Sequence, residues 1–226
     1  MRLQRNEYLL FLANFLINNH ILWHVFSIFV HKDNEIMGKN IAILASGNGT
    51  NAENIIQHFG TTEHRVKLVL TNSQKAFALE RARKLGVKCA YFSKDFWADG
   101  NSILSMLQTE GIDFIVLAGF LSRVPDNILR AYPRRIVNIH PSLLPKFGGK
   151  GMYGDMVHQA VLASGDKESG ITIHYTNEHY DEGQIIAQYS CAVNPDDTFI
   201  TLANRVHTLE YEYYPKVIEK LLNELG

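Results

Sequence analysis

Residues 137–145 place an amide and an imidazole two positions apart, where an apolar run stops. Alternate side chains of an extended strand share a face, so Asn138 and His140 are expected to project together. Pro141 cannot donate to a sheet ladder, so the strand is expected to end there. An amide N–H beside an imidazole suits oxyanion stabilisation and proton movement, which makes the pair a candidate catalytic centre. A strand end that only satisfies loop backbone is the alternative reading of this segment.

Asp181 is a carboxylate that can act with this pair. It lies between two predicted strands, in the sequence that leads to Gly183. A carboxylate near His140 would raise the pKa of the imidazole and favour its charged form. An Asp before a Gly is also common as a turn residue, so a purely structural role stays open.

Residues 45–52 form a glycine-containing loop between the first predicted strand and helix. Backbone N–H groups at such a helix N-terminus bind anions. Gly47, Gly49 and Ala52 also match the dinucleotide fingerprint G-x-G-x-x-A, but residues 70–72 lack the acidic residue that would hold a ribose. A monophosphate site is therefore predicted, with a simple tight turn as the alternative.

The pattern of cysteines and histidines predicts no metal site. Cys89 and Cys191 are the only cysteines and have no metal-ligand spacing, which favours a reducing, cytoplasmic location. Four histidines have no ligand partner at suitable spacing and are predicted to be packing or surface residues: His158, His174, His179 and His207.

The composition suits one globular domain. The chain has 226 residues, of which 46% are hydrophobic and 20% charged, and its formal net charge is −1. A neutral balance gives no global reason to expect nucleic-acid binding, so small-molecule chemistry is favoured.

The first 37 residues differ from the rest of the chain. Residues 8–30 form an apolar stretch long enough to span a bilayer, but Asn and His residues interrupt it at a high cost in hydrocarbon. A membrane anchor is therefore not expected. Residues 1–37 are interpreted as an apolar N-terminal extension, with residues 1–36 included by an early start assignment.

From residue 38 onward, short apolar runs alternate with helical patterns, which indicates an α/β domain over residues 38–226. The prediction is a Rossmann-like, mostly parallel sheet of about seven strands with helices on both faces. Strands are expected at residues 41–45, 66–71, 87–91, 114–118, 135–140, 171–176 and 184–193. Helices are expected at residues 51–59, 76–85, about 99–110, 125–131, 155–163 and 198–225. The glycine-dense residues 146–154 are expected to form a mobile, functional loop.

Together these motifs resemble the folate-dependent formyltransferase family, and within it the members that act on glycinamide ribonucleotide. The resemblance spans residues 39–222 and is carried by residues 46–51, 117–120 and 138–145 and by Asp181-x-Gly183. It implies a catalytic domain with the formyltransferase fold. It also implies transfer of a formyl group from 10-formyltetrahydrofolate to the amine of the ribonucleotide, in purine biosynthesis, without a metal.

The resemblance assigns site residues by position. It implies a catalytic triad of Asn138, His140 and Asp181. It implies ribonucleotide contacts at Gly49, Thr50, Asn51 and Glu210. It implies folate contacts at Phe120, Leu121, Val124, Asn138, Asn177 and Asp181. The chain departs from the family at Ser122-Arg123, in a longer loop at residues 147–156, and in residues 99–102, where a folate-contacting Arg has no counterpart.

Other functions remain alternatives. A methionyl-tRNA formyltransferase would need a nucleic-acid-binding extension, and a formyltetrahydrofolate hydrolase would be expected to carry an N-terminal regulatory domain and no phosphate loop. A non-catalytic nucleotide-binding module would leave Asn138, His140 and Asp181 as a coincidence. The expected partners are the two small-molecule substrates, with a monomer or homodimer as the assembly.

Overall fold

The structure is a computed structural model that describes residues 38–225. The apolar extension predicted for residues 1–37 lies outside the described residues. Within residues 38–225, no helix combines the length and the apolar character needed to cross a membrane.

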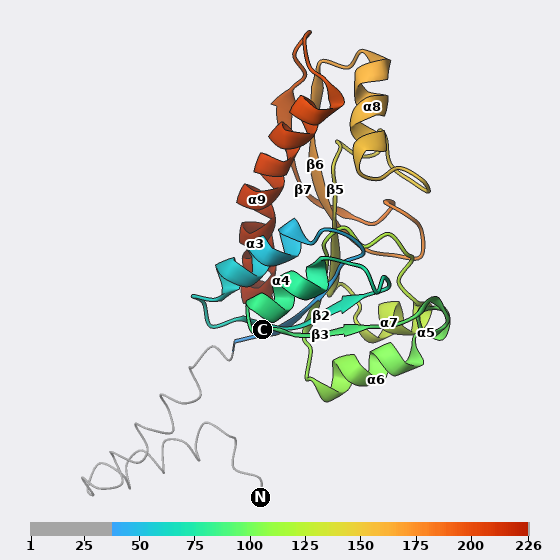
Figure 1. Cartoon of the computed structure of the whole chain (residues 1–226), viewed down its shortest axis with the longest axis vertical. Coiled ribbons are helices and arrows are strands. Elements are labelled where there is room, and N and C mark those ends of the chain that lie inside the picture. Colours follow the sequence, from blue (N-terminus) through green and yellow to red (C-terminus); the bar gives the residue numbers. More distant parts are fainter. Residues whose placement is uncertain (1–37, 226) are drawn as a thin grey trace, which may run out of the picture. The chain divides into compact units, whose positions relative to one another are not determined.

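Seven strands form one sheet in the order β3-β2-β1-β4-β5-β6-β7. The neighbours from β3 to β5 pair in parallel, and β6 and β7 add to β5 as antiparallel strands. The predicted α/β class with a mostly parallel sheet is therefore confirmed (Figure 1). The strands are β1 Asn40–Leu44, β2 Arg65–Thr71, β3 Lys88–Tyr91, β4 Phe114–Leu117, β5 Ile136–His140, β6 Glu168–Tyr175 and β7 Ile185–Ala192.

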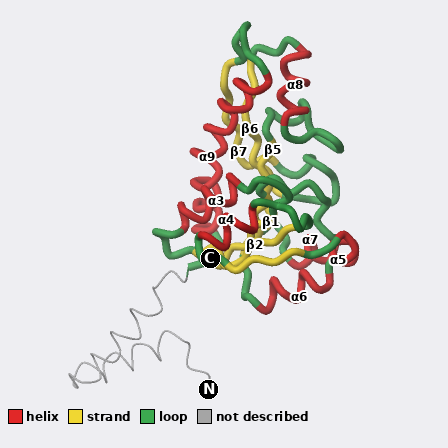
Figure 2. Tube along the Cα trace, viewed as in Figure 1, coloured by secondary structure: helices red, strands yellow, loops and turns green. Residues whose placement is uncertain are grey.

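Helices cover both faces of the sheet because the strands alternate apolar side chains between the faces. In β1, Ile41 and Ile43 join one buried cluster with α3, α4, α8 and α9, whereas Ala42 and Leu44 join a second cluster with α5, α6 and α7. Figure 2 shows helix on both sides of the sheet in the same view. The helices are α3 Thr50–Phe59, α4 Ala78–Lys84, α5 Lys94–Asp99, α6 Asn101–Thr109, α7 Asp126–Ala131, α8 Asp155–Ser164 and α9 Phe199–Glu224.

The helix predicted near residues 99–110 is confirmed as α6, but the sequence did not predict the short helix α5, which Gly100 separates from it. Gly100 has φ +70°, in the left-handed region that stops a helix. A Cβ there would lie 2.5 Å from Asn127 Oδ1 and 2.6 Å from Pro125 Cβ, so the break also lets α7 approach closely. The other predicted elements are present, with ends shifted by a few residues.

The strand order creates a crevice beside β1. The chain leaves β1 toward β2 and β3 and then returns to its other side at β4, so the loops after β1 and β4 diverge at this switch point. Ser46 joins the two loops: its N–H donates to the Gly119 carbonyl (3.0 Å), and its Oγ accepts from the Leu121 N–H (2.9 Å). Ligands of open α/β sheets bind at such a point.

Helix α9 is fastened to the sheet by a buried phenol. Tyr214 is fully buried, and its hydroxyl lies 2.9 Å from the Leu117 carbonyl and 3.2 Å from the Val137 carbonyl. Burial raises the pKa of Tyr214 well above its ordinary value, so the hydroxyl stays a donor. The ends of β4 and β5 are thereby held against α9.

We expect Thr198→Ala to lower the free energy of unfolding by about 1 kcal/mol, measured by urea denaturation. Thr198 begins α9: its Oγ1 accepts from the Thr201 N–H (3.2 Å), and Thr201 Oγ1 accepts from the Thr198 N–H (3.0 Å). Thr208→Ala is the matched control, since the Thr208 hydroxyl only donates to the Asn204 carbonyl within the helix (3.0 Å). Equal losses in the two variants would contradict a capping role.

Candidate active site

A cavity of about 630 Å³ opens at the carboxyl ends of β1, β4 and β5. Every residue that the sequence singled out for catalysis or binding lines it. These residues are Gly49, Thr50, Asn51, Phe120, Leu121, Val124, Asn138, His140, Asn177, Asp181 and Glu210. The fold thus gathers them in one place, while their individual roles remain predictions.

The predicted triad lies within one polar cluster. Asn138 and His140 come from β5, and Asp181 comes from the turn between β6 and β7, where its φ is +58°. Asp181 Oδ2 lies 3.5 Å from His140 Nδ1, and Asp181 Oδ1 lies 3.5 Å from Asn138 Nδ2. Asp181 therefore serves as a turn residue and also belongs to the polar cluster.

Asp181 raises the pKa of His140, as predicted, but burial has the larger effect. The ring is 3% exposed, and burial lowers its pKa below the ordinary value of 6.5. Asp181 and the carbonyl of Phe147 act in the opposite direction but do not offset burial. His140 Nε2–H donates to the Phe147 carbonyl (2.7 Å), so the neutral ring carries its lone pair on Nδ1, toward Asp181.

Asp181 is ionised in spite of its burial. Burial alone raises the pKa of this carboxyl, but the rings of His174 and His140 and the N–H of Gly149 together hold it below its usual value. The Gly149 N–H donates to Asp181 Oδ2 at 2.9 Å. The glycine-dense loop thus contributes a backbone donor to the cluster, which its composition alone did not indicate.

The loop after β1 leads into a helix N-terminus that no side chain caps. Gly49 is the N-cap of α3 with φ +76°, and no side chain caps this helix. A Cβ on Gly49 would lie 2.5 Å from Ala78 Cβ, so only glycine fits. No side chain caps the first N–H groups of α3, and Thr50 and Asn51 line the cavity, so this terminus is suited to bind an anion.

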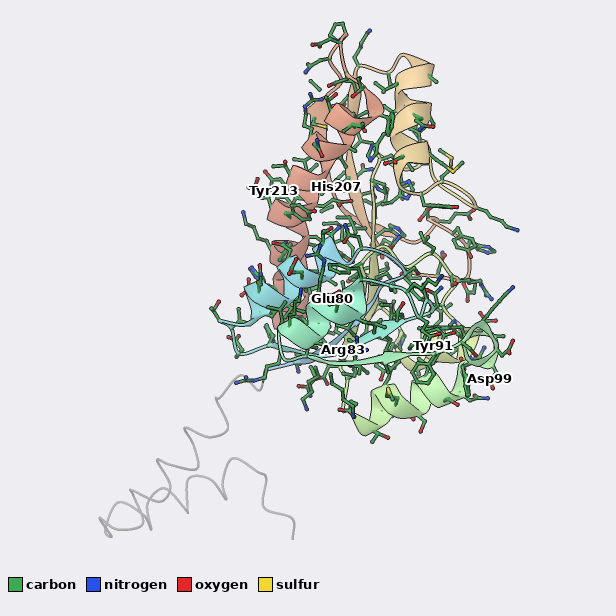
Figure 3. All side chains as sticks on the ribbon, in the orientation of Figure 1. Glu80, Arg83, Tyr91, Asp99, His207 and Tyr213 are labelled. Atoms are coloured by element: carbon green, nitrogen blue, oxygen red, sulfur yellow. The ribbon has the colours of Figure 1, made fainter. Side chains whose placement is uncertain are left out.

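Glu210 on α9 closes this side of the cavity. Its carboxylate is 4% exposed and accepts from Asn51 Nδ2 (2.8 Å), and it also contacts His207 Nδ1 (2.9 Å). The hydrogen bond to Glu210 raises the pKa of His207 and so favours a cation beside the α3 N-terminus. Figure 3 labels His207 on α9.

Apolar side chains form another part of the cavity wall. Phe120 and Val124 are buried, Leu121 is half exposed, and Trp97 packs on Phe120 with ring centroids 4.6 Å apart. Asn177 lines the same wall from the end of β6. A planar ring system that carries a few polar groups fits between such a wall and the polar cluster.

The histidines predicted to be packing or surface residues also line the cavity, which the sequence did not indicate. They are His158, His174, His179 and His207. The position of His207 near Glu210 could have been predicted from the sequence, because His207 stands three residues before Glu210 on a predicted helix. The contact of His174 with Asn138 could not, because it depends on the pairing of two strands. Among residues 38–225, no group of three or more His, Cys, Asp or Glu side chains is arranged to hold a metal ion.

The comparisons agree with this geometry. Residues 39–218 match the family model described as formyl transferase. The chain belongs to the formyl transferase family. Curated members named phosphoribosylglycinamide formyltransferase are similar to it: that of Bacillus subtilis is 37% identical, over 81% of this chain and 95% of its own length.

Other members of the formyl transferase family are longer. The chloroplastic phosphoribosylglycinamide formyltransferase of Arabidopsis thaliana is 41% identical over 82% of this chain, which spans 66% of that protein. The chain spans 62% of the Vigna unguiculata relative. Among solved structures, glycinamide ribonucleotide transformylase 1 of Symbiobacterium toebii superposes with a TM-score of 0.76 at 33% identity, over 84% of this chain and 90% of its own.

We expect Gly49→Ala to reduce the free energy of unfolding by more than about 1 kcal/mol, because alanine is strained at φ +76° and collides with Ala78. Thermal or urea unfolding measures the loss. Gly47→Ala is the matched control in the same loop: its Cβ would have no heavy atom within 4 Å, so a change within about 0.5 kcal/mol is expected. Similar losses in both variants would contradict a specific requirement for glycine at position 49.

Proposed function

We propose that this chain transfers the formyl group of 10-formyltetrahydrofolate to the amine of glycinamide ribonucleotide, a step of purine biosynthesis. One observation carries the proposal: the cluster of Asn138, His140 and Asp181 shares one cavity with the uncapped N-terminus of α3 and with a set of apolar side chains. The arrangement supports two substrates that meet at the cluster. The names of the similar proteins support the same substrates.

The ribonucleotide is proposed to occupy the side of α3. Its phosphate accepts hydrogen bonds from the backbone N–H groups of Thr50 and Asn51, next to the flexible turn at Gly49. The carboxylate of Glu210 is buried and held by Asn51, so it is oriented to accept from ribose hydroxyls. The phosphate anchors the substrate with its amine toward β5.

The folate is proposed to occupy the apolar wall. Phe120, Leu121 and Val124 provide the flat apolar contact that a pterin ring needs, and Asn177 and Asp181 provide polar groups at its edge. The formyl group then lies beside Asn138. Both substrates are small molecules, and the proposal needs no nucleic-acid partner.

The side chains of the cluster can carry out each step of formyl transfer. The amine nitrogen attacks the formyl carbon, and the oxygen that gains negative charge accepts from Asn138 Nδ2–H. Neutral His140 takes up the amine proton at Nδ1, and the carboxylate of Asp181 3.5 Å away stabilises the resulting imidazolium. The imidazolium then gives this proton to the departing folate nitrogen as the carbon–nitrogen bond breaks. The products are the formylated amine and tetrahydrofolate, with no net proton change.

The direct test is an assay of the full chain with both substrates, run beside reactions that contain water alone or methionyl-tRNA with a free amine in place of the ribonucleotide. Formylated ribonucleotide as the product is expected. Release of formate without the ribonucleotide would instead identify a hydrolase, and formylation of the tRNA a methionyl-tRNA formyltransferase. Either result would overturn the proposal.

We expect His140→Ala to reduce transfer to background while ribonucleotide binding survives, because His140 moves the proton but does not hold the phosphate. Steady-state rates and calorimetric titration with the ribonucleotide measure the two effects. His58→Ala is the control: His58 contacts Glu219 (2.8 Å) away from the cavity. Near-normal turnover of His140→Ala would refute the mechanism.

The pKa of His140, lowered by burial, predicts the pH profile of kcat/KM. The substrate amine loses reactivity below about pH 8 as it becomes protonated, which gives a first fall. Protonation of His140 removes the proton acceptor, so a second and steeper fall is expected below about pH 6.5. A rate that instead declines as the pH rises through neutrality would show that the charged imidazole is the reactive form.

A further inference from the structure

His174 is the buried neighbour of Asn138 across the sheet. β5 and β6 pair in antiparallel fashion with Asn138 directly opposite His174, so the two side chains share a face. His174 is 2% exposed, and the pairing of β6 with β7 is irregular between Ile173 and His174. Bulges of this kind re-aim side chains beside active sites. The strand pairing therefore places the buried ring of His174 in the cavity wall.

The hydrogen bonds of His174 define which ring nitrogen carries the proton. Nδ1 lies 3.0 Å from the carbonyl of Tyr175, which can only accept, so Nδ1 is the donor. With Nδ1 as the donor, Nε2 is the nitrogen that can accept. Its partner is Asn138 Nδ2 at 3.1 Å, whereas Asp181 Oδ1 lies at 3.6 Å, beyond hydrogen-bond distance.

Gly183 leaves room for the hydrogen bond between His174 and the Tyr175 carbonyl. A Cβ on Gly183 would lie 1.6 Å from the carbonyl oxygen of Tyr175 and 3.4 Å from His174 Nδ1. Any side chain there would displace the carbonyl that accepts from the ring. The glycine two residues after Asp181 thus preserves the donor–acceptor order of His174.

We propose that His174 is a positioning residue that orients the amide of Asn138 for catalysis. Building on the proposed formyl transfer, the inference adds a residue that acts through Asn138 rather than on a substrate. One amide N–H is held by His174 Nε2. The second reaches only Asp181 Oδ1, at 3.5 Å, and is the hydrogen that the formyl oxygen captures as its charge develops.

The orientation of the Asn138 amide decides whether its nitrogen can donate a hydrogen bond to the formyl oxygen. Rotated by half a turn, its Oδ1 would face the lone pair of His174 Nε2 and the carboxylate of Asp181, two acceptors with no proton to share. With His174 present, the nitrogen is therefore held on this side of the group. Without it, only the long contact to Asp181 remains to orient the amide.

Two substitutions of His174 distinguish the roles of its two ring nitrogens. A substitution of Asn138 tests whether His174 acts through the Asn138 amide. In His174→Asn, the side-chain amide can still donate to the Tyr175 carbonyl from the place of Nδ1, but nothing accepts from Asn138. His174→Gln places an oxygen near the position of Nε2 and restores an acceptor. Asn138→Ala removes the group through which His174 acts, alone and combined with His174→Asn.

We expect His174→Asn to lower kcat about 10²-fold with both KM values unchanged, since misorientation of a catalytic group has a cost of this order. His174→Gln is expected to recover most of the rate. Asn138→Ala is expected to lose about 10²–10³-fold, and the double variant to be no slower than Asn138→Ala alone. His64→Asn is the control for a buried histidine elsewhere, since His64 contacts Lys39 and Asn223.

The outcomes are distinguishable. An active wild-type enzyme whose His174→Asn variant keeps its kcat, or loses rate equally with and without Asn138, would overturn the inference and leave the proposed function intact. A wild-type enzyme that transfers no formyl group would overturn both. If His174→Asn does not fold, the rate of the folded His174→Gln variant decides: recovery supports the inference, and a loss as large as that of Asn138→Ala overturns it.

Discussion

The carboxylate of Asp181 is the constraint on which the site depends. It faces an amide from β5, an imidazole from β5, an imidazole from β6 and a backbone N–H from the glycine-dense loop. A buried carboxylate is costly unless such donors and charges surround it. The need to satisfy it therefore fixes the relative positions of segments that are far apart in the sequence.

The change from parallel to antiparallel pairing after β5 makes this convergence possible. A parallel neighbour would begin at the opposite edge of the sheet, whereas β6 runs back along β5 and places His174 beside Asn138. The turn that follows then returns to the carboxyl edge and delivers Asp181 to the cavity. The same edge holds the loops after β1 and β4, so the start of α3, the apolar wall and the polar cluster share one cavity.

Burial and charge act against each other at this cluster. For His140, desolvation outweighs the nearby carboxylate and leaves the imidazole neutral, whereas for Asp181 the surrounding donors outweigh desolvation and leave the carboxylate charged. A neutral acceptor beside a fixed anion is suited to receive a proton and to be stabilised once it has done so. The cluster is therefore prepared for the charge that develops during transfer.

Local pattern was enough to predict much of this protein. Strand periodicity placed Asn138 and His140 on one face, the alternation of apolar runs predicted the α/β sheet, and the glycines of residues 45–52 predicted the turn before α3, because each depends only on nearby residues. The 3.5 Å separation of Asp181 from His140, the contact of His174 with Asn138 and the neutral state of His140 were decided by the tertiary structure. The physical reason is that distances across strands depend on register between distant segments, and protonation depends on how completely the rest of the chain removes water.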